Sequence, residues 1–279
     1  MIVFPNAKIN LGLNILSRRS DGYHNLDMVM IPVGWSDILE IVPAGGEVTT
    51  LTVSGRPVGC PTEKNLVYKA WRLLSDYIDG DLPPVDIFLH KIIPDGAGLG
   101  GGSSDAAFTL IALNKLFALG LTDAQLCEIA GRLGADCPFF IYNRPMLCRE
   151  TGTLMTPVEV NMSGIKAILI AKPEATSVST AEAYSGVVPR QPEETCDIVV
   201  SSSSPDRWNG RLINGFEHHI FKLKPDIAEI KRLILDGGAV YASMSGSGSA
   251  VYGMFDDVRL AEETARRLSG CACHIDKID

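Results

Sequence analysis

A glycine-rich stretch near the middle of the chain constrains the fold more than any other part of the sequence. It reads Pro94-Asp95-Gly96-Ala97-Gly98-Leu99-Gly100-Gly101-Gly102-Ser103-Ser104. Residues 85–90 before it alternate like a strand, and apolar residues after it recur at helical spacing, with Ser103 or Ser104 as the expected N-cap. A strand, a glycine loop and a helix N-terminus predict an anion site, because unpaired amides and the positive end of the helix dipole face the ligand.

The stretch differs from the two commonest phosphate-binding loops. Gly96, Gly98 and Gly101 have the spacing of the dinucleotide pattern, but the following helix leads into another helix rather than into a second strand ending in an acid. The P-loop ends in Gly-Lys-Ser/Thr, whereas Gly102 is followed directly by Ser103. We therefore expect a third type of phosphate loop, with its lysine supplied from elsewhere. A helix-start turn without a ligand is the alternative, and the density of glycine exceeds what a turn requires.

The N-terminal strand offers such a lysine. Apolar side chains take one face of the strand expected within residues 1–16, while Lys8, Asn10 and Asn14 take the other face. This polar face beside a hydrophobic N-terminus suits a binding site. A solvated strand face explains it equally well, and both interpretations stay open on this segment alone.

Asp136 is a candidate catalytic base. It follows a helix expected over residues 122–133, which begins with a Thr122–Gln125 capping box and ends at Gly134. Aromatic residues directly after it give the carboxylate partly apolar surroundings, which suit a base. Spacing alone favours a different interpretation, in which Asp136 caps a short helix with Pro138 in its first turn.

Tyr23 and His24 come directly after an Asp21-Gly22 turn signal. An aromatic ring beside a histidine can stack on a flat ring and hydrogen-bond to its edge. A surface turn with a half-buried tyrosine is the plain alternative, and the local sequence by itself favours it.

The rest of the chain predicts an α/β protein with a domain boundary near residues 147–157. Residues 186–209 contain several prolines and four successive serines, which predicts a long mobile excursion. The glycine-serine run 245–249 joins two strands as a turn, and it can also close over a phosphate or support the first loop. Helices are expected over 62–78, 214–223, 225–235 and 256–269, and strands over 26–42 (broken at Pro32 and at 35–37), 48–53, 165–171, 239–244, 250–255 and 271–278.

Composition excludes several classes of protein. A net charge of -8 argues against a nucleic-acid surface, which requires a basic stripe. The first residues lack the pattern of a secretory signal, and no apolar run approaches the ~20 residues of a membrane span. Seven scattered cysteines indicate free thiols in a reducing cytoplasm. The sequence predicts no metal cluster: Cys271 and Cys273 share one strand face, and a structural zinc site needs four ligands.

Three motifs in order along the chain resemble those of the GHMP kinases. The glycine stretch 94–104 is similar to their ATP-binding motif, residues 6–11 resemble their first motif, and Gly238 with residues 244–249 resembles their third. The resemblance implies an α/β fold of two lobes: an S5-like N-terminal lobe, residues 1–155, and a ferredoxin-like C-terminal lobe, residues 156–279. It also implies ATP and Mg²⁺, with Pro94 to Ser104 around the phosphates and Asn65, Leu66 and Lys91 near the adenosine.

Two further segments narrow the resemblance within this family. Residues 19–24 and residues 134–140 are similar to the members that phosphorylate the 2-hydroxyl of a cytidine diphosphate-linked methylerythritol, in the non-mevalonate route to isoprenoid precursors. By this resemblance, Asp136 is the general base and Lys8 the cation beside the transferring phosphoryl group. Tyr23 stacks on the cytosine, His24 reads its edge, and Asn10 helps to place the methylerythritol.

Two alternative functions remain beside this prediction, together with one difference from the sequences of the family. The chain can instead be a GHMP kinase of the homoserine or mevalonate type, although those enzymes do not need residues that recognise cytidine. It can also be a nucleotide-binding regulator that catalyses no reaction, although such a protein needs no catalytic base. Relatives have Asn-Asp where this chain has Asn214-Gly215, which leaves the role of that segment open. A monomer or weak homodimer in the cytoplasm is expected.

Overall fold

A computed structural model of the protein describes residues 1–78 and 82–278. The chain forms two compact units. The first unit comprises Met1–Ala7, Gly34–Asp95 and Gly100–Arg144, and the second comprises Lys8–Val33, Gly96–Leu99 and Pro145–Asp279. This division differs from a boundary at 155/156, because Lys8–Val33 and Gly96–Leu99 group with the residues from Pro145 onward. The hydrogen bonds of Gly98 with Ser245 and of Leu13 with Ile213 are examples of the contacts that join these segments. The final residue of the expected C-terminal lobe, 279, lies outside the described residues.

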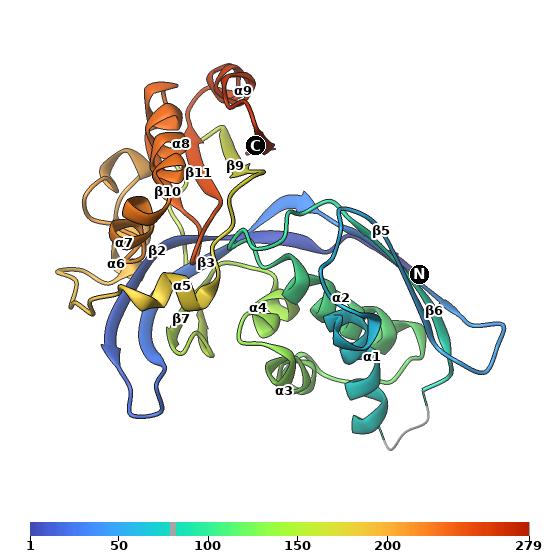
Figure 1. The fold of residues 1–279 in the computed structure, drawn as a ribbon. Coiled ribbons are helices and arrows are strands. Elements are labelled where there is room, and N and C mark those ends of the chain that lie inside the picture. Colours follow the sequence, from blue (N-terminus) through green and yellow to red (C-terminus); the bar gives the residue numbers. More distant parts are fainter. Residues whose placement is uncertain (79–81, 279) are drawn as a thin grey trace. The chain divides into compact units, whose positions relative to one another are not determined.

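The first unit contains a sheet with the strand order β1-β4-β6-β5. Among the strand pairs described for this sheet, β5 with β6 is parallel and the others are antiparallel. The strand expected before the glycine loop is confirmed as β6, whose side chains alternate between buried and more exposed positions over most of its length. The strands are β1 (Ile2–Val3), β4 (Ile38–Pro43), β5 (Thr50–Gly55) and β6 (Val85–Lys91). Four helices of this unit lie together in Figure 1: α1 (Leu66–Tyr77), α2 (Gly101–Leu116), α3 (Asp123–Leu133) and α4 (Cys137–Tyr142).

The helix after the glycine loop, α2, begins earlier than the sequence predicts. Its N-cap is Gly100, with φ 71° in the left-handed region, and no side chain caps it. The expected serine cap is therefore wrong, because Ser103 and Ser104 already lie within the first turn. A left-handed residue at this position suits glycine, which has no Cβ to clash.

The elements around Asp136 agree well with the sequence. The Thr122–Gln125 capping box of α3 is confirmed in both of its hydrogen bonds, and Gly134 ends that helix. The short helix after Asp136 is confirmed as α4, with Pro138 in its first turn. Helix 62–78 is divided into a 3₁₀ turn, η1 (Thr62–Lys64), and α1, because Asn65 caps α1 by accepting from the Val67 amide.

The second unit contains a sheet with the strand order β2-β3-β7-β8. The expected break of the second strand at Pro32 is wrong, since β3 runs through it to Ser36. β3 pairs with β7 only over Leu26–Met30, so no hydrogen bond to β7 is lost at Pro32. The strands are β2 (Asn6–Arg18), β3 (His24–Ser36), β7 (Met146–Glu150) and β8 (Leu154–Pro157).

A second antiparallel sheet in this unit has the order β10-β11-β9-β12. Helices α8 and α9 pack against it, as Figure 1 shows. The hairpin expected around residues 245–249 is confirmed by the pairing of β10 with β11. These elements are β9 (Ala167–Pro173), β10 (Tyr241–Met244), β11 (Val251–Phe255), β12 (Cys271–Lys277), α7 (Glu217–Leu223), α8 (Pro225–Asp236) and α9 (Val258–Arg267).

From Cys196 onward, the segment 186–209 is packed rather than a loose excursion. It contains α6 (Cys196–Ser202) and a 3₁₀ turn, η2 (Pro205–Arg207), and follows α5 (Thr180–Ser185). Trp208 is fully buried, and its indole nitrogen donates to the Ser203 carbonyl. Buried apolar residues of α6 hold this segment in place, and its proline and serine content gives no indication of them. Across the described parts of the chain, no helix combines the length and apolar character needed to span a membrane.

Candidate active site

The residues expected at the site are distributed over both units. The first unit contains Asn65, Leu66, Lys91, Pro94, Asp95, Gly100, Gly101, Gly102, Ser103, Ser104 and Asp136. The second contains Lys8, Asn10, Tyr23, His24, Gly96, Ala97, Gly98 and Leu99. The chain passes from one unit to the other within the glycine stretch itself.

The first turn of α2 presents backbone amides in the first unit. The Ser104 amide donates to the Gly100 carbonyl at 2.9 Å, so the amides of Gly101, Gly102 and Ser103 precede the first helical hydrogen bond. Gly102 is exposed. The helix dipole adds about half a positive charge at this end. The turn therefore has what an anion site requires.

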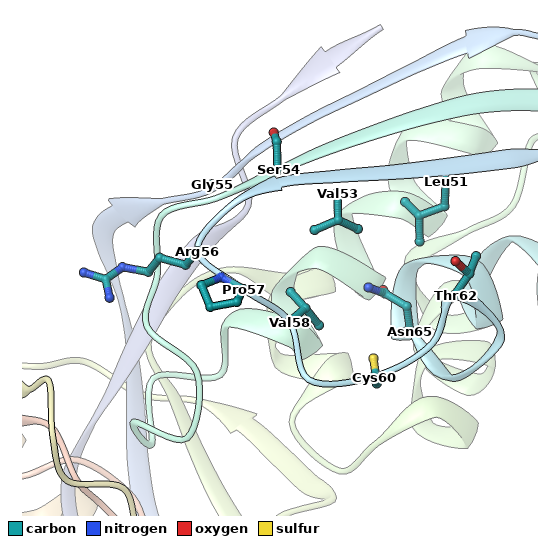
Figure 2. Close-up of a pocket in the computed structure, with 10 residues that line it drawn as sticks. All are labelled: Leu51, Val53, Ser54, Gly55, Arg56, Pro57, Val58, Cys60, Thr62 and Asn65. Atoms are coloured by element: carbon teal, nitrogen blue, oxygen red, sulfur yellow. The ribbon is translucent and has the colours of Figure 1, made fainter.

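A pocket of about 360 Å³ lies at the start of α1, in the same unit. In Figure 2, Leu51, Val53 and Val58 point toward the space in front of Asn65 and Cys60. The lining combines apolar side chains with polar groups, a mixture that suits a flat ring with hydrogen-bonding edges. The pocket is linked to α2 by Leu66, whose Cδ1 lies 3.7 Å from where a Cβ on Gly102 would stand. The apolar lining residues were not among those expected from the sequence.

Lys91 is not one of the residues that line this pocket. Its ammonium group is buried and forms ion pairs with Asp37 and with Asp105, the latter at 2.6 Å. Burial alone would lower the pKa of Lys91, but the charges of Asp105 and Asp37 outweigh it and raise that pKa. Neither carboxylate was expected at the site from the sequence.

Asp136 is half-buried at the N-cap position of α4, yet its side chain makes no cap hydrogen bond there. The interpretation of Asp136 as a side-chain cap therefore fails, because the hydrogen bond that would define the cap is not made. Its neighbour Cys137 lies near Ser103 of α2: burial raises the Cys137 pKa to about 11, a Ser103 hydrogen bond opposes this, and the Asp136 charge adds to it. The carboxylate thus belongs to a segment beside the first turn of α2.

In the second unit, the other glycine-serine loop supports the first one. The Ser245 hydroxyl donates to the Gly98 carbonyl at 2.9 Å, and the Ala250 amide donates to the Ala97 carbonyl at 3.0 Å. A Cβ on Gly98 would lie 2.1 Å from the Ser245 carbonyl oxygen, so only glycine fits there. Of the roles considered for residues 245–249, support of the first loop is confirmed.

Lys8 and Asn10 form a buried pair on β2. The Lys8 ammonium donates to Asn10 Oδ1 at 2.6 Å, and the two residues are 4% and 1% exposed. The Lys8 amide donates to the Leu99 carbonyl, and the Asn10 amide donates to the Ser245 hydroxyl at 3.3 Å. A solvated strand face is therefore excluded. Lys8 and Asn10 stand beside both loops.

Tyr23 lies on a tightly bonded surface turn. Its side chain is 66% exposed, while its amide donates to Asp21 Oδ1 and its carbonyl accepts from the Arg19 amide. The Tyr23 amide lowers the pKa of Asp21 against the opposing effect of desolvation, and Arg19 contributes to the same lowering. The backbone is thus fixed and the ring is presented to solvent.

His24 stacks on Tyr184 of α5, with ring centroids 4.7 Å apart and 21° between the planes. Tyr184 in turn packs edge-on against Phe216. Burial lowers the pKa of His24, and the Arg18 charge lowers it further. A neutral imidazole follows at neutral pH, which can donate with one nitrogen and accept with the other. Tyr184 was missed because its segment shows no motif in the sequence.

Asn214, whose role the sequence left open, holds the second loop. Its side-chain amide donates to the carbonyls of Met244 and Gly246, both at 2.8 Å, and its oxygen accepts from the Phe216 amide. Asn214 also lines a second pocket, of about 340 Å³, together with His218 and His219. The departure at Gly215 leaves these contacts intact.

Comparisons with known proteins identify the family of the chain. Residues 65–144 match the family model of the GHMP kinases N terminal domain, and residues 204–273 match that of the GHMP kinases C terminal. A curated relative from Azobacteroides pseudotrichonymphae, named 4-diphosphocytidyl-2-C-methyl-D-erythritol kinase, is 46% identical over 91% of this chain and 93% of its own length.

Solved structures show the same fold. The crystal structure of a 4-(cytidine 5'-diphospho)-2C-methyl-D-erythritol kinase has a TM-score of 0.83 and 31% identity, covering all of both chains. A mevalonate kinase has a TM-score of 0.76 at 14% identity, covering 99% of this chain and 98% of its own, which supports the fold alone. The expected two-lobed α/β class is therefore confirmed, and the chain belongs to the GHMP kinase family.

Proposed function

We propose that the protein transfers the γ-phosphoryl group of ATP to the 2-hydroxyl of 4-diphosphocytidyl-2-C-methyl-D-erythritol. The observation that carries this proposal is the 46% identity, over 91% of the chain, to a relative named for that kinase activity. The Tyr23–His24 turn supports the choice of acceptor, since an exposed aromatic ring beside a neutral imidazole suits a pyrimidine base.

ATP binds along the first unit in this proposal. The adenine enters the pocket at Asn65, whose mixture of apolar and polar lining groups suits a flat ring with hydrogen-bonding edges. Leu66 leads from that pocket to Gly102, and the phosphates meet the amides at the first turn of α2. We also assign Pro94, Asp95 and the residues from Gly96 to Leu99 to ATP binding.

The acceptor is recognised by residues of the second unit. Tyr23 stacks on the cytosine, and His24 hydrogen-bonds to its edge. Tyr184 joins them, because it already stacks on His24 and keeps that ring in one orientation. Asn10 helps to place the methylerythritol, held by its bonds to Lys8 and Ser245.

Asp136 acts as the general base. The 2-hydroxyl oxygen forms a bond to the γ-phosphorus, its proton passes to the Asp136 carboxylate, and the bond to the leaving ADP oxygen breaks. Lys8 stabilises charge on the transferring phosphoryl group, since positioning and charge stabilisation dominate such reactions. Support for Asp136 comes from its half-buried position in the segment whose Cys137 hydrogen-bonds with Ser103 of the α2 turn.

Mg²⁺ fits the oxygen groups of the α2 turn. The Ser104 hydroxyl is fully buried and has no hydrogen-bond partner among the described residues, and Mg²⁺ prefers oxygen ligands. Ser103 and Ser104 would therefore help to hold the ion, which supplies neutralising charge to the phosphates. We propose that the enzyme works in the cytoplasm on small molecules alone, as a monomer or weak homodimer.

The test offers the purified protein Mg·ATP with one acceptor at a time and follows ADP release. The acceptors are the cytidylylated methylerythritol, homoserine and mevalonate, with an acceptor-free reaction as the control for ATP hydrolysis. We expect turnover with the first acceptor, and ³¹P NMR of the product should show a phosphomonoester on the 2-hydroxyl. Turnover with homoserine or mevalonate alone would assign a different GHMP kinase activity. ATP binding without any turnover would support a nucleotide-binding regulator.

A further inference from the structure

Lys172, near the end of β9 in the second unit, is a buried lysine without a partner. The residue is 6% exposed, and its side chain forms no hydrogen bond or ion pair with any other residue that the structure describes. Lysine is almost never buried unless it is paired, because the ammonium group loses its hydration. The charge of Lys172 therefore lacks the anion that its burial requires.

The other buried lysines of the described chain are both paired. Lys8 and Lys91 are likewise less than a tenth exposed. Lys91 forms ion pairs with two carboxylates, and the Lys8 ammonium donates to Asn10 Oδ1. The Nζ atom of Lys172 does not belong to the fully enclosed polar atoms that lack a partner, so it keeps some contact with solvent. A ligand anion can approach it from there.

The side chain of Lys172 lies on the face of its sheet that is turned toward β2. Side chains two residues apart on a strand share a face, so Lys172 shares one with Ile170 and with Tyr252, the pairing partner of Ile170. The Tyr252 hydroxyl donates to the Asn10 carbonyl of β2 at 2.9 Å. Helix α8 covers the opposite face, where a Cβ on Gly253 would clash with it. The ammonium is therefore on the side of the sheet where Asn10 lies.

The glycine loop lies beside this end of β9. Pairing of β9 with β11 ends at Ala171 and Val251, so Lys172 is level with Ala250, one residue beyond the last pair. The Ala250 amide donates to the Ala97 carbonyl at 3.0 Å. Across the strands, Ala250 thus joins the level of Lys172 to the loop.

The chain that follows β9 returns to the same loop. A Cβ on Gly96 would lie 3.6 Å from the Ser177 Cβ, and the Ser249 hydroxyl donates to the Thr176 carbonyl at 2.9 Å. The Ser249 amide in turn donates to the Gly96 carbonyl at 3.4 Å. All of these residues belong to the second unit. Lys172 is therefore flanked on two sides by segments that contact the loop.

This loop is one that needs a cation. Gly96 to Leu99 belong to the stretch assigned to ATP binding, and that stretch lacks the lysine of a P-loop. Hydrogen bonds between an ammonium group and a phosphate are charge-assisted and stronger than neutral ones. A phosphate bound at the loop would give the Lys172 charge the counter-ion that the described residues do not provide.

We propose that Lys172 binds a phosphate group of ATP at the Gly96–Leu99 loop. Lys8 keeps its role at the transferring phosphoryl group, and Lys172 adds affinity for the nucleotide before any reaction takes place. The inference rests on the proposed function in taking ATP as the ligand.

The test compares the wild-type protein with Lys172→Met, which keeps an unbranched apolar stem and removes the charge. Dissociation constants for Mg·ATP and for adenosine are measured by calorimetry without acceptor, so that no turnover is needed. We expect the affinity for Mg·ATP to fall by about tenfold to 100-fold, the usual contribution of a hydrogen bond to a charged group. The affinity for adenosine should stay the same, since it has no phosphate. Lys172→Arg keeps the charge and should keep most of the affinity for Mg·ATP.

Lys166→Met is the matched control. Lys166 is exposed and directly precedes β9, at the end of the strand away from the loop, so this variant should bind Mg·ATP as the wild type does. Without ligand, Lys172→Met should unfold at no lower temperature than the wild type, because it removes a buried charge that has no partner. Mg·ATP should raise its melting temperature less than that of the wild type.

Three results would overturn the inference. Unchanged affinity for Mg·ATP in folded Lys172→Met would show that the ammonium does not contact a phosphate. Equal losses for Mg·ATP and adenosine, or a lower melting temperature of the ligand-free variant, would make Lys172 a structural residue. The acceptor also carries a diphosphate, so its dissociation constant is measured separately, and a loss for the acceptor alone would assign Lys172 to that diphosphate.

These binding measurements also separate the inference from the proposed function. A protein that shows the expected binding differences but transfers no phosphoryl group would contradict the kinase activity and support the role of Lys172. A wild-type protein that binds no Mg·ATP would contradict both.

Discussion

The first turn of α2 and the Tyr23–His24 turn are built in opposite ways. The α2 turn rests on the buried ion pairs of Lys91 with two carboxylates and on residues of the core, and only its outer face, at Gly102, is exposed. The Tyr23–His24 turn lies on the surface and is held by its own backbone and by Asp21, with the Tyr23 ring 66% exposed.

This difference parallels a difference between the two proposed ligands, of which the phosphate donor is the more general and the acceptor the more specific. A phosphate site that uses backbone amides and buried charges is part of the fold, so it cannot change without disturbing the core. A base-recognition site on a surface turn can change by single side chains. The same scaffold can therefore keep one phosphate donor while its acceptor changes.

Asp136→Asn should have the largest effect, because it removes the proposed base beside the α2 turn. We expect kcat to fall by at least ~100-fold with little change in KM for ATP, since general-base catalysis typically contributes about 10²–10⁴-fold. Steady-state kinetics with the cytidylylated acceptor measure both constants. Near-normal turnover would remove Asp136 from the base role.

Gly98→Ala and Gly22→Ala compare the two regions by the same substitution. Both glycines have positive φ, but a Cβ meets the Ser245 carbonyl at Gly98 and nothing within 4 Å at Gly22. Gly22→Ala should cost about 1 kcal/mol of unfolding free energy through its backbone strain alone. Gly98→Ala should cost at least about 2 kcal/mol more, because two loops must separate. Urea unfolding measures both, and equal losses would mean that the loops are not tightly supported.

Tyr23→Ala should have a smaller and more selective effect. Loss of one stacking ring should raise KM for the cytidylylated acceptor by about tenfold, as aromatic–base stacking is worth roughly 1–3 kcal/mol. KM for ATP and the unfolding free energy should hardly change, because the ring is exposed. Tyr23→Phe is the control and should keep most of the affinity. An unchanged KM for the acceptor in Tyr23→Ala would contradict the stacking role.

Local patterns in the sequence predicted the elements of the fold well. The predictions of the α3 capping box, of the strand before the glycine loop and of the hairpin at residues 245–249 were correct, because each depends on residues close together in the chain. The packing of segment 186–209 was not predicted, since the buried Trp208 packs edge-on against Tyr241 of β10, a residue far later in the chain. Proline and serine content describes the backbone of such a segment and not its contacts.

The parts of the candidate site that belong to one continuous sequence motif could be proposed from the sequence. The charged support of the α2 turn was not, because Asp37 is separated by more than 50 residues from Lys91, and Asp105 looks like any polar residue of a helix. A charged residue at a buried helical position was the signal that could have identified Asp105. Tyr184 gave no comparable signal, since its stacking on His24 depends on the fold alone.

The support of the glycine loop by residues 245–250 has a consequence for the order of folding. Ala97 and Gly98 bond to partners about 150 residues later in the chain. During synthesis the loop therefore emerges long before its support does, and it acquires its final shape only once the last hairpin has been made and docked. A chain that stops before residue 245 would contain the whole glycine motif and still lack the contacts that hold it.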